Sequence, residues 1–138
     1  MLVTGQDVTA IGLPGEDEDA FSWAEVARRL KDGQRLSGLG EQESAYLTLW
    51  IAFERMMRFQ ARRVALPVDR LAPSILIRQL YSNGELSMAQ FDSALECQTV
   101  RNRIVHGFPA ASLGKAVANL DRLERELMEQ WSSPQDES

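Results

Sequence analysis

The residues best suited to chemistry in this chain are Arg101, Asn102 and His106, which lie close together in the stretch RNRIVHG. His106 is the only histidine of the 138 residues. A histidine can move a proton at neutral pH, and an arginine can hold and neutralise a charged, phosphorane-like transition state. Together the two side chains could cleave RNA through its own 2′-hydroxyl without a metal ion. The alternative is structural, because a lone histidine near a helix end needs no catalytic role and motifs this short match many unrelated proteins.

The spacing of these residues constrains any such site. At ~100° per residue, Asn102 and His106 share one helix face, whereas Arg101 and His106 lie about 140° apart around the axis. A regular helix therefore cannot aim Arg101 and His106 in one direction. Either His106 leaves the helix just before Gly107, or the site is approached from more than one side, as at the two-fold axis of a dimer. A symmetric dimer would also bring two histidines together, one as base and one as acid.

The helix that carries these residues is expected to span 88–106. Ser87 and Gln90 have the spacing of a capping box at its start. Gly107 stands where a helix C-terminus favours glycine, and Pro109 follows shortly after.

Other stretches show helical patterns with period 3 to 4. The expected helices are 22 to about 31 with an end near Gly33, then 41–65, 74–81 and 112–131. The triplet Ile75-Leu76-Ile77 also fits a strand, but no partner strand is visible elsewhere in the sequence. The pattern predicts an all-α fold, an up-down bundle of four to five helices.

Composition and charge divide the chain into three parts. Residues 1–20 form an acidic leader that could be disordered, 21–131 form one helical bundle domain, and 132–138 form a polar tail. The net charge is −5, but the leader and tail hold 7 of the 20 acids and none of the 15 bases, so the body has 13 acids against 15 bases. The body can therefore present a positive surface despite the acidic total, and the leader could fold over that surface as an autoinhibitory cover.

The basic residues of the body are mostly arginines, which bind phosphate as a planar fork. Arg55, Arg58 and Arg62 fall on one helix face at i, i+3 and i+7, and Arg103 joins them as a candidate contact to an RNA backbone. The alternative is a solvated helix face, which is the usual state of such charge clusters. Trp50, Phe53 and Phe59 could stack on bases, but their helical spacing favours the core.

The class of the protein is also limited by what the sequence lacks. The start MLVTGQDV has no basic and apolar segment of a signal peptide, and no apolar run is long enough to span a bilayer. We therefore expect a cytoplasmic protein with no membrane partner. The single Cys97 excludes an internal disulfide and a cysteine-based zinc site, and it is expected to pack as a small hydrophobic residue. We expect no metal ion and no other cofactor.

The stretch RNRIVHG resembles the signature of the HEPN superfamily, an arginine often followed by asparagine and then, a few residues later, a histidine. AYLTLWIAFERMMR resembles the core helix of that family, and LIRQLYSNGELSMAQFDSALECQTVRNRIVHG resembles the stretch that leads into its signature helix. The likeness covers roughly residues 41–131. It implies a four- or five-helix bundle that forms a homodimer through the signature helices. It also implies a metal-independent endoribonuclease of a toxin, antiphage or RNA-processing system, with Arg101 and His106 catalytic and Asn102 as orienter.

The resemblance also suggests partners and an alternative. A toxin of this family would have a cognate antitoxin or a nucleotidyltransferase as partner, and nucleotidylated members carry a tyrosine two residues after the histidine. Phe108 stands at that position here, which argues against control through a modified tyrosine. Other members keep the fold and serve only as dimerisation or binding modules, for a partner protein or a nucleotide.

Glu54 is expected to support the site or to pair on the surface. It lies in a very apolar helix, and a buried carboxylate needs a partner. In the family an acid on this helix often sits near the signature, which makes Arg101 one candidate partner. Arg58, at i+4, is the other.

Overall fold

The computed structural model describes residues 21–67, 71–110 and 112–132, and all regular structure in these ranges is α-helical. The helices are α2 (Trp23–Gly38), α3 (Gln42–Arg63), α4 (Pro73–Ser82), α5 (Met88–Val105) and α6 (Leu113–Trp131). The predicted all-α bundle is confirmed. The acidic leader and all but the first residue of the polar tail lie outside the described residues, and so does the proposed cover of the arginines.

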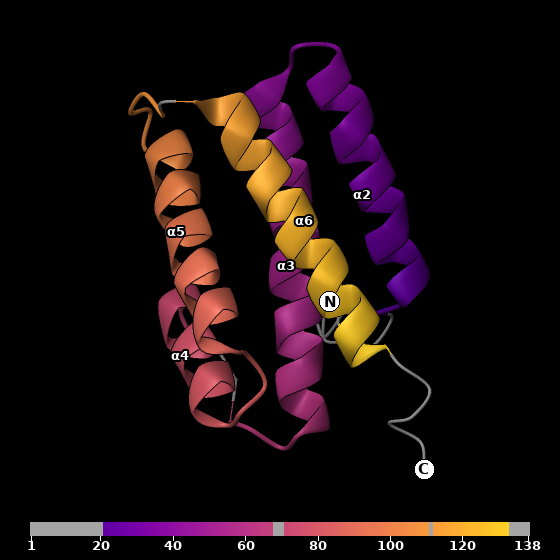
Figure 1. Ribbon diagram of the computed structural model, residues 1–138, viewed down its shortest axis with the longest axis vertical. Coiled ribbons are helices and arrows are strands. Elements are labelled where there is room, and N and C mark those ends of the chain that lie inside the picture. The colour runs from indigo at the N-terminus through magenta and orange to yellow at the C-terminus, as the bar shows by residue number, and fades with distance from the viewer. Residues whose placement is uncertain (1–20, 68–70, 111, 133–138) are drawn as a thin grey trace, which may run out of the picture.

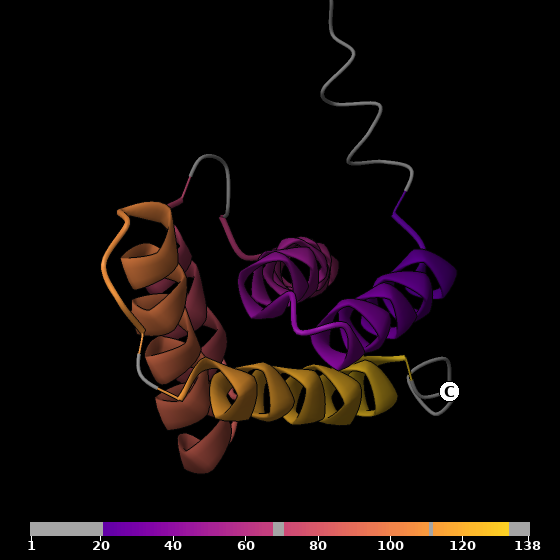
Figure 2. The same ribbon diagram turned by 90° about the horizontal axis from the view of Figure 1, so that it is seen from above.

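The long helices alternate in direction (Figure 1). Along the chain α2, α3, α5 and α6 run up, down, up and down, and the short α4 pairs with α5. Seen from above, α4 and α5 form one edge of the molecule and α2 the opposite edge, with α3 and α6 between them (Figure 2). Because α6 contacts α2, α3 and α5, it joins the two halves of the bundle. None of the described helices is long and apolar enough to cross a membrane.

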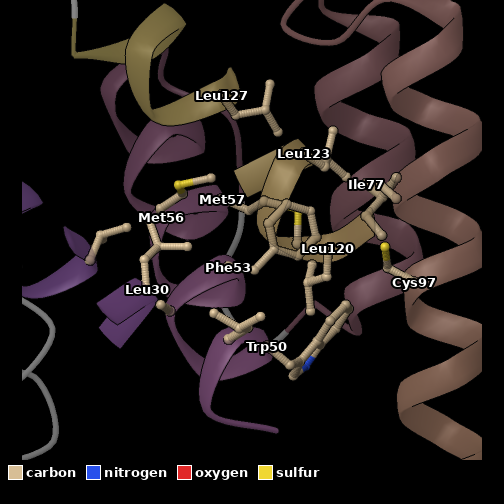
Figure 3. Packing of buried hydrophobic residues seen from close by; sticks show 14 of the residues in the cluster. Leu30, Trp50, Phe53, Met56, Met57, Ile77, Cys97, Leu120, Leu123 and Leu127 are labelled. Carbon is tan, nitrogen blue, oxygen red and sulfur yellow. The ribbon is translucent and has the colours of Figure 1, made fainter. Parts of the chain in front are cut away.

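The centre of the core is formed by α3. Phe53, Met56 and Met57 are fully buried, and around them pack side chains from every other described helix (Figure 3). Trp50 is also buried, and Phe59 is half-buried and stacked on Phe21. These aromatic rings therefore serve packing.

Gly33 does not end its helix, so that prediction is wrong. The helix α2 continues to Gly38, and Gly33 is buried in its interior. A Cβ at Gly33 would lie 2.6 Å from Cδ2 and 2.8 Å from Cγ of the buried Leu49 on α3. Glycine at this position therefore allows the backbone of α2 to approach α3 closely. The turn comes later, at Gly40, whose φ of +83° suits glycine.

The α4–α5 turn is tied to α3 and α6 by hydrogen bonds that centre on Glu85. Gln60 Nε2 donates to Glu85 Oε1 at 2.8 Å, and Asn83 Nδ2 donates to Glu85 Oε2 at 3.2 Å. The carbonyl oxygen of Glu85 accepts from Gln130 Nε2 at 3.2 Å and from Trp131 Nε1 at 3.3 Å. One short turn thus binds both the end of α3 and the end of α6.

Candidate functional site

The candidate site lies at the C-terminal end of α5, where the sequence predicted a helix stop. The amide of His106 still donates to the carbonyl of Asn102 at 3.0 Å, so His106 completes the last turn as the C-cap. Gly107 follows with φ +78°, and the amide of Phe108 donates to the carbonyl of Arg103 at 2.8 Å. Because His106 stays on the helical ladder, it does not turn back toward Arg101, and its side chain is exposed to solvent.

Arg101 is bound to the neighbouring asparagine. Its Nη1 donates to Asn102 Oδ1 at 3.0 Å, and both residues are half-buried. Asn102 lies four residues before His106 and therefore on the same helix face. The guanidinium of Arg101 therefore lies beside the side chain of Asn102, the residue that shares a helix face with position 106.

The rotation of α5 is fixed from the core by Tyr46 of α3. The hydroxyl of Tyr46 donates to the backbone carbonyl of Cys97 at 2.6 Å, and both side chains are buried. In an α-helix the amide of Arg101 bonds that same carbonyl. Burial raises the pKa of the Tyr46 hydroxyl far above its ordinary value, and it raises the pKa of the Cys97 thiol to about 11. Cys97 is thus a protonated, packed thiol at neutral pH and no nucleophile.

Apolar side chains flank the histidine on the surface. Val105 is 46% exposed and Phe108 is 60% exposed, on either side of His106 in the sequence. The buried residues of the helix α5 are Gln90, Ala94 and Cys97, although apolar residues lie around its whole circumference. No residue of α5 after Cys97 is buried, so the C-terminal half of the helix has less cover from its own chain than the N-terminal half.

Glu54 pairs with Arg58 and not with Arg101. The shortest contact is 2.8 Å, from Arg58 Nη2 to Glu54 Oε2, and Trp50 Nε1 donates to Glu54 Oε1 at 3.1 Å. The Glu54 side chain is 27% exposed. Of the two partners that the sequence left open, the structure selects the one four residues away.

The arginine line of α3 is partly committed to internal contacts. Arg58 Nη2 also donates to the carbonyl of Leu71 at 2.8 Å, and Arg55 Nη2 lies 3.9 Å from Glu25 Oε1 on α2. Arg62 and Arg103 are exposed. The contacts of Arg58 hold it in the bundle. Of the four arginines proposed to contact RNA, Arg103 lies nearest along the chain to the candidate site, one turn from His106 on α5.

Two features were not predicted from the sequence. A cavity of about 80 Å³ opens between α5 and α6, and its lining includes Tyr46, Ser93, Glu96, Cys97, Asn119 and Arg122. Glu124 of α6 is fully buried, although it stands among the leucines that define the apolar face of that helix. The cavity arises between two helices and has no local signal, whereas an acid inside a leucine stripe could have been noticed in the sequence.

Among the described residues, no group of three or more histidine, cysteine, aspartate and glutamate side chains could hold a metal ion. The end of α5 thus holds an exposed imidazole and a guanidinium that is hydrogen-bonded to the side-chain amide of Asn102. Comparison with known proteins gave no match, neither to a family model nor to a curated protein nor to a solved structure.

Proposed function

We propose that the chain is a metal-independent endoribonuclease of HEPN type that acts as a homodimer. Arg101 and His106 are its catalytic residues and Asn102 is a positioning residue. The contact that carries the proposal is the hydrogen bond from Arg101 Nη1 to Asn102 Oδ1, because it holds the guanidinium beside the side chain of Asn102, the residue that shares a helix face with the solvent-open His106. A guanidinium held in this way loses little conformational freedom when it binds a phosphate.

The dimer follows from what a single chain lacks. One imidazole cannot be base and acid in the same step, and the chain has one histidine. Val105 and Phe108 expose apolar surface next to His106, and burial of such surface favours association. A second copy seated on the end of α5 would cover these side chains and bring a second histidine and arginine to the axis.

In the reaction, one imidazole takes the proton of a ribose 2′-hydroxyl as that oxygen attacks the adjacent phosphorus. The guanidinium of Arg101 neutralises the charge that develops on the phosphoryl oxygens. The bond to the 5′-oxygen breaks, and the second imidazole, which enters the step protonated, gives its proton to that oxygen. The products are a 2′,3′-cyclic phosphate and a free 5′-hydroxyl, with protons and charges balanced and no metal ion in any step.

The biological setting is part of the same proposal. A nuclease of this kind fits a cytoplasmic toxin or defence component whose cognate antitoxin keeps it inactive. Phe108 lacks the hydroxyl that a nucleotidyltransferase would modify at this position, so control through a bound antitoxin is favoured over control through modification. Arg103, exposed one turn from His106, is the candidate for contact with the RNA backbone near the site. Arg62 is also exposed, but the end of α3 that carries it is tied to the α4–α5 turn, at the other end of α5.

The test is RNA cleavage in the presence of EDTA, with the wild type, Arg101→Ala, His106→Ala and Asn102→Ala. We expect His106→Ala and Arg101→Ala each to lower the rate at least about 100-fold, and Asn102→Ala to lower it less. Lys115→Ala is the matched control, an exposed cation on α6, and should leave the rate within about twofold. Circular dichroism checks that each variant is helical. Cleavage that survives both of the first two substitutions would refute the assignment.

A second function is favoured by one observation, the exposed Phe108 in place of a tyrosine. In that case the chain is a non-catalytic module that dimerises or binds a partner protein or a nucleotide through the same end of α5. It then shows no cleavage of any RNA, and His106→Ala scarcely changes its association, whereas Phe108→Ser weakens it.

A further inference from the structure

A carboxyl group without a partner lies in the apolar face of α6. Glu124 has no exposed surface, and neither of its side-chain oxygens has a hydrogen-bond partner. Leu120, Leu123 and Leu127, which surround it on the helix, point into the core (Figure 3). An ionised carboxylate in such a place would cost far more free energy than a neutral one.

A polar side chain one turn away on the same helix is also incomplete in its hydrogen bonds. Asp121 lies one turn before Glu124, and its Oδ1 accepts from Arg125 Nε at 2.6 Å. Its Oδ2 is buried and has no partner. Residues three apart on a helix are neighbours. A protonated Glu124 would supply the donor that this Asp121 oxygen lacks.

The other helices supply no charge to Glu124. The charged groups that act on it are Asp121 and Arg125, both of α6. From α3 and α5 it faces Tyr46 and Cys97, whose raised pKa values keep both neutral near pH 7. The buried residues of α2, which also packs on α6, are Val26, Leu30 and Gly33. The surroundings therefore favour the neutral acid from every side except that of Arg125.

We propose that Glu124 keeps its proton in the folded chain at neutral pH and donates it to Oδ2 of Asp121, and that this carboxyl pair is a pH-sensitive latch which holds α6 on the core. The pair carries one negative charge, which faces Arg125. Loss of the proton at alkaline pH would place a buried carboxylate beside the partly exposed carboxylate of Asp121 and favour release of α6. This inference is independent of the proposed ribonuclease activity.

The direction of the pH effect follows from the pKa of Glu124. Burial raises it well above the ordinary value of 4.5, the charge of Asp121 raises it further, and Arg125 lowers it. In the unfolded chain the group titrates near 4.5. Above that pH unfolding releases a proton, so stability falls as the pH rises, until the pKa of the folded state is reached. The contribution is complete below the ordinary pKa and is lost on the alkaline side.

The test is urea unfolding of the full chain at a series of pH values between about 5 and 8. For the wild type, the unfolding equilibrium constant should rise by up to about tenfold per pH unit from this one group. Glu124→Gln, which carries no charge at any pH, should remove that part of the slope. Asp121→Asn should end the slope at lower pH, because the charge that helps to hold the proton is gone. Glu126→Gln, an exposed acid of the same helix, is the matched control and should keep the wild-type slope.

A second measurement does not depend on the variants being stable. The infrared spectrum of the wild type at neutral pH should contain the carbonyl band of a protonated carboxyl group, and that band should persist in Glu126→Gln. Glu124→Leu replaces the acid by an apolar side chain and should gain stability relative to the wild type as the pH rises. Equal slopes for the wild type and Glu124→Gln, or a wild-type spectrum without the protonated carboxyl band, would overturn the proposal.

Discussion

The two ends of α5 differ in how their side chains are used. At the N-terminal end, Ser87 and Gln90 form a reciprocal capping box, with bonds of 2.8 and 3.1 Å. Gln90 also donates to Gln130 of α6 at 3.1 Å. At the C-terminal end, Val105, His106 and Phe108 are exposed. Side-chain hydrogen bonds tie the first end to the rest of the chain, although Met88 there is 60% exposed. The other end presents an imidazole and two apolar side chains to solvent.

The difference shows where this fold gains stability and where it can interact. Around the α4–α5 turn, a hydrogen-bonded network and a buried tryptophan hold the helices together, and Met88 is an exposed apolar side chain there. At the C-terminal end of α5, apolar side chains and the imidazole are exposed to solvent, and exposed apolar surface is typical of interaction sites. Substitutions at the first end should therefore act on stability, and substitutions at the second end should act on association and activity.

The largest effect is expected at the α4–α5 turn, from Trp131→Ala. Trp131 is 2% exposed, its Nε1 donates to the carbonyl of Glu85, and its own carbonyl accepts from Arg63 Nη1 at 2.9 Å. Removal of the ring should lower the free energy of unfolding by about 3–5 kcal/mol, measured by urea denaturation. The exposed neighbour Glu129→Gln should stay within about 0.5 kcal/mol of the wild type. A loss below about 1 kcal/mol for Trp131→Ala would show that this end does not anchor the bundle.

A smaller effect is expected from Ser87→Ala. The substitution removes the side-chain acceptor for the amide of Gln90 and one half of the capping box. It should cost about 1 kcal/mol of stability, measured in the same way. The comparison is Ser82→Ala, an exposed serine at the other side of the turn, which should change little. If the two serines behaved alike, the capping box would have no energetic role.

The smallest effect on stability is expected at the C-terminal end of α5, from Val105→Ser and Phe108→Ser. Because both side chains are half-exposed or more, each change should alter the free energy of unfolding of the monomer by at most about 0.5 kcal/mol. The same variants should shift the monomer–dimer equilibrium toward monomer in sedimentation equilibrium. Leu39→Ser is the matched control, because Leu39 is 67% exposed at the α2–α3 turn, away from α5. A wild type that is monomeric at every concentration, or a dimer unaffected by Phe108→Ser, would show that the C-terminal end of α5 does not mediate association.

The helices were predictable because their limits depend on local residues. The capping box at Ser87 and the glycine at 107 act within a few positions, so sequence spacing alone identifies both ends of α5. Gly33 was misread for the opposite reason, because its role depends on Leu49 of another helix. Local patterns contain no information on which helix approaches which.

The residues of the candidate site were proposed from the sequence, but their contacts could not be predicted from it. The types and spacing of Arg101, Asn102 and His106 pointed to the end of α5, and the angular argument exposed the need for a second approach. Glu54 had two candidate partners, and the choice of Arg58 over Arg101 rests on how α3 and α5 are placed relative to each other. The burial of Glu124 likewise results from α6 packing across the bundle, which no single helix reveals.

The hydrogen bond from Tyr46 to the backbone of Cys97 has a consequence for whatever meets α5. Successive residues advance by ~100° around a helix axis, so a slip of α5 by one position would turn that carbonyl away from the hydroxyl. The hydroxyl of Tyr46 inside the core therefore fixes the rotation of α5, and with it the direction in which Arg101, one turn after Cys97, leaves the helix. A molecule that binds the surface of α5 would therefore meet Arg101 in a direction fixed beforehand by a buried residue of α3.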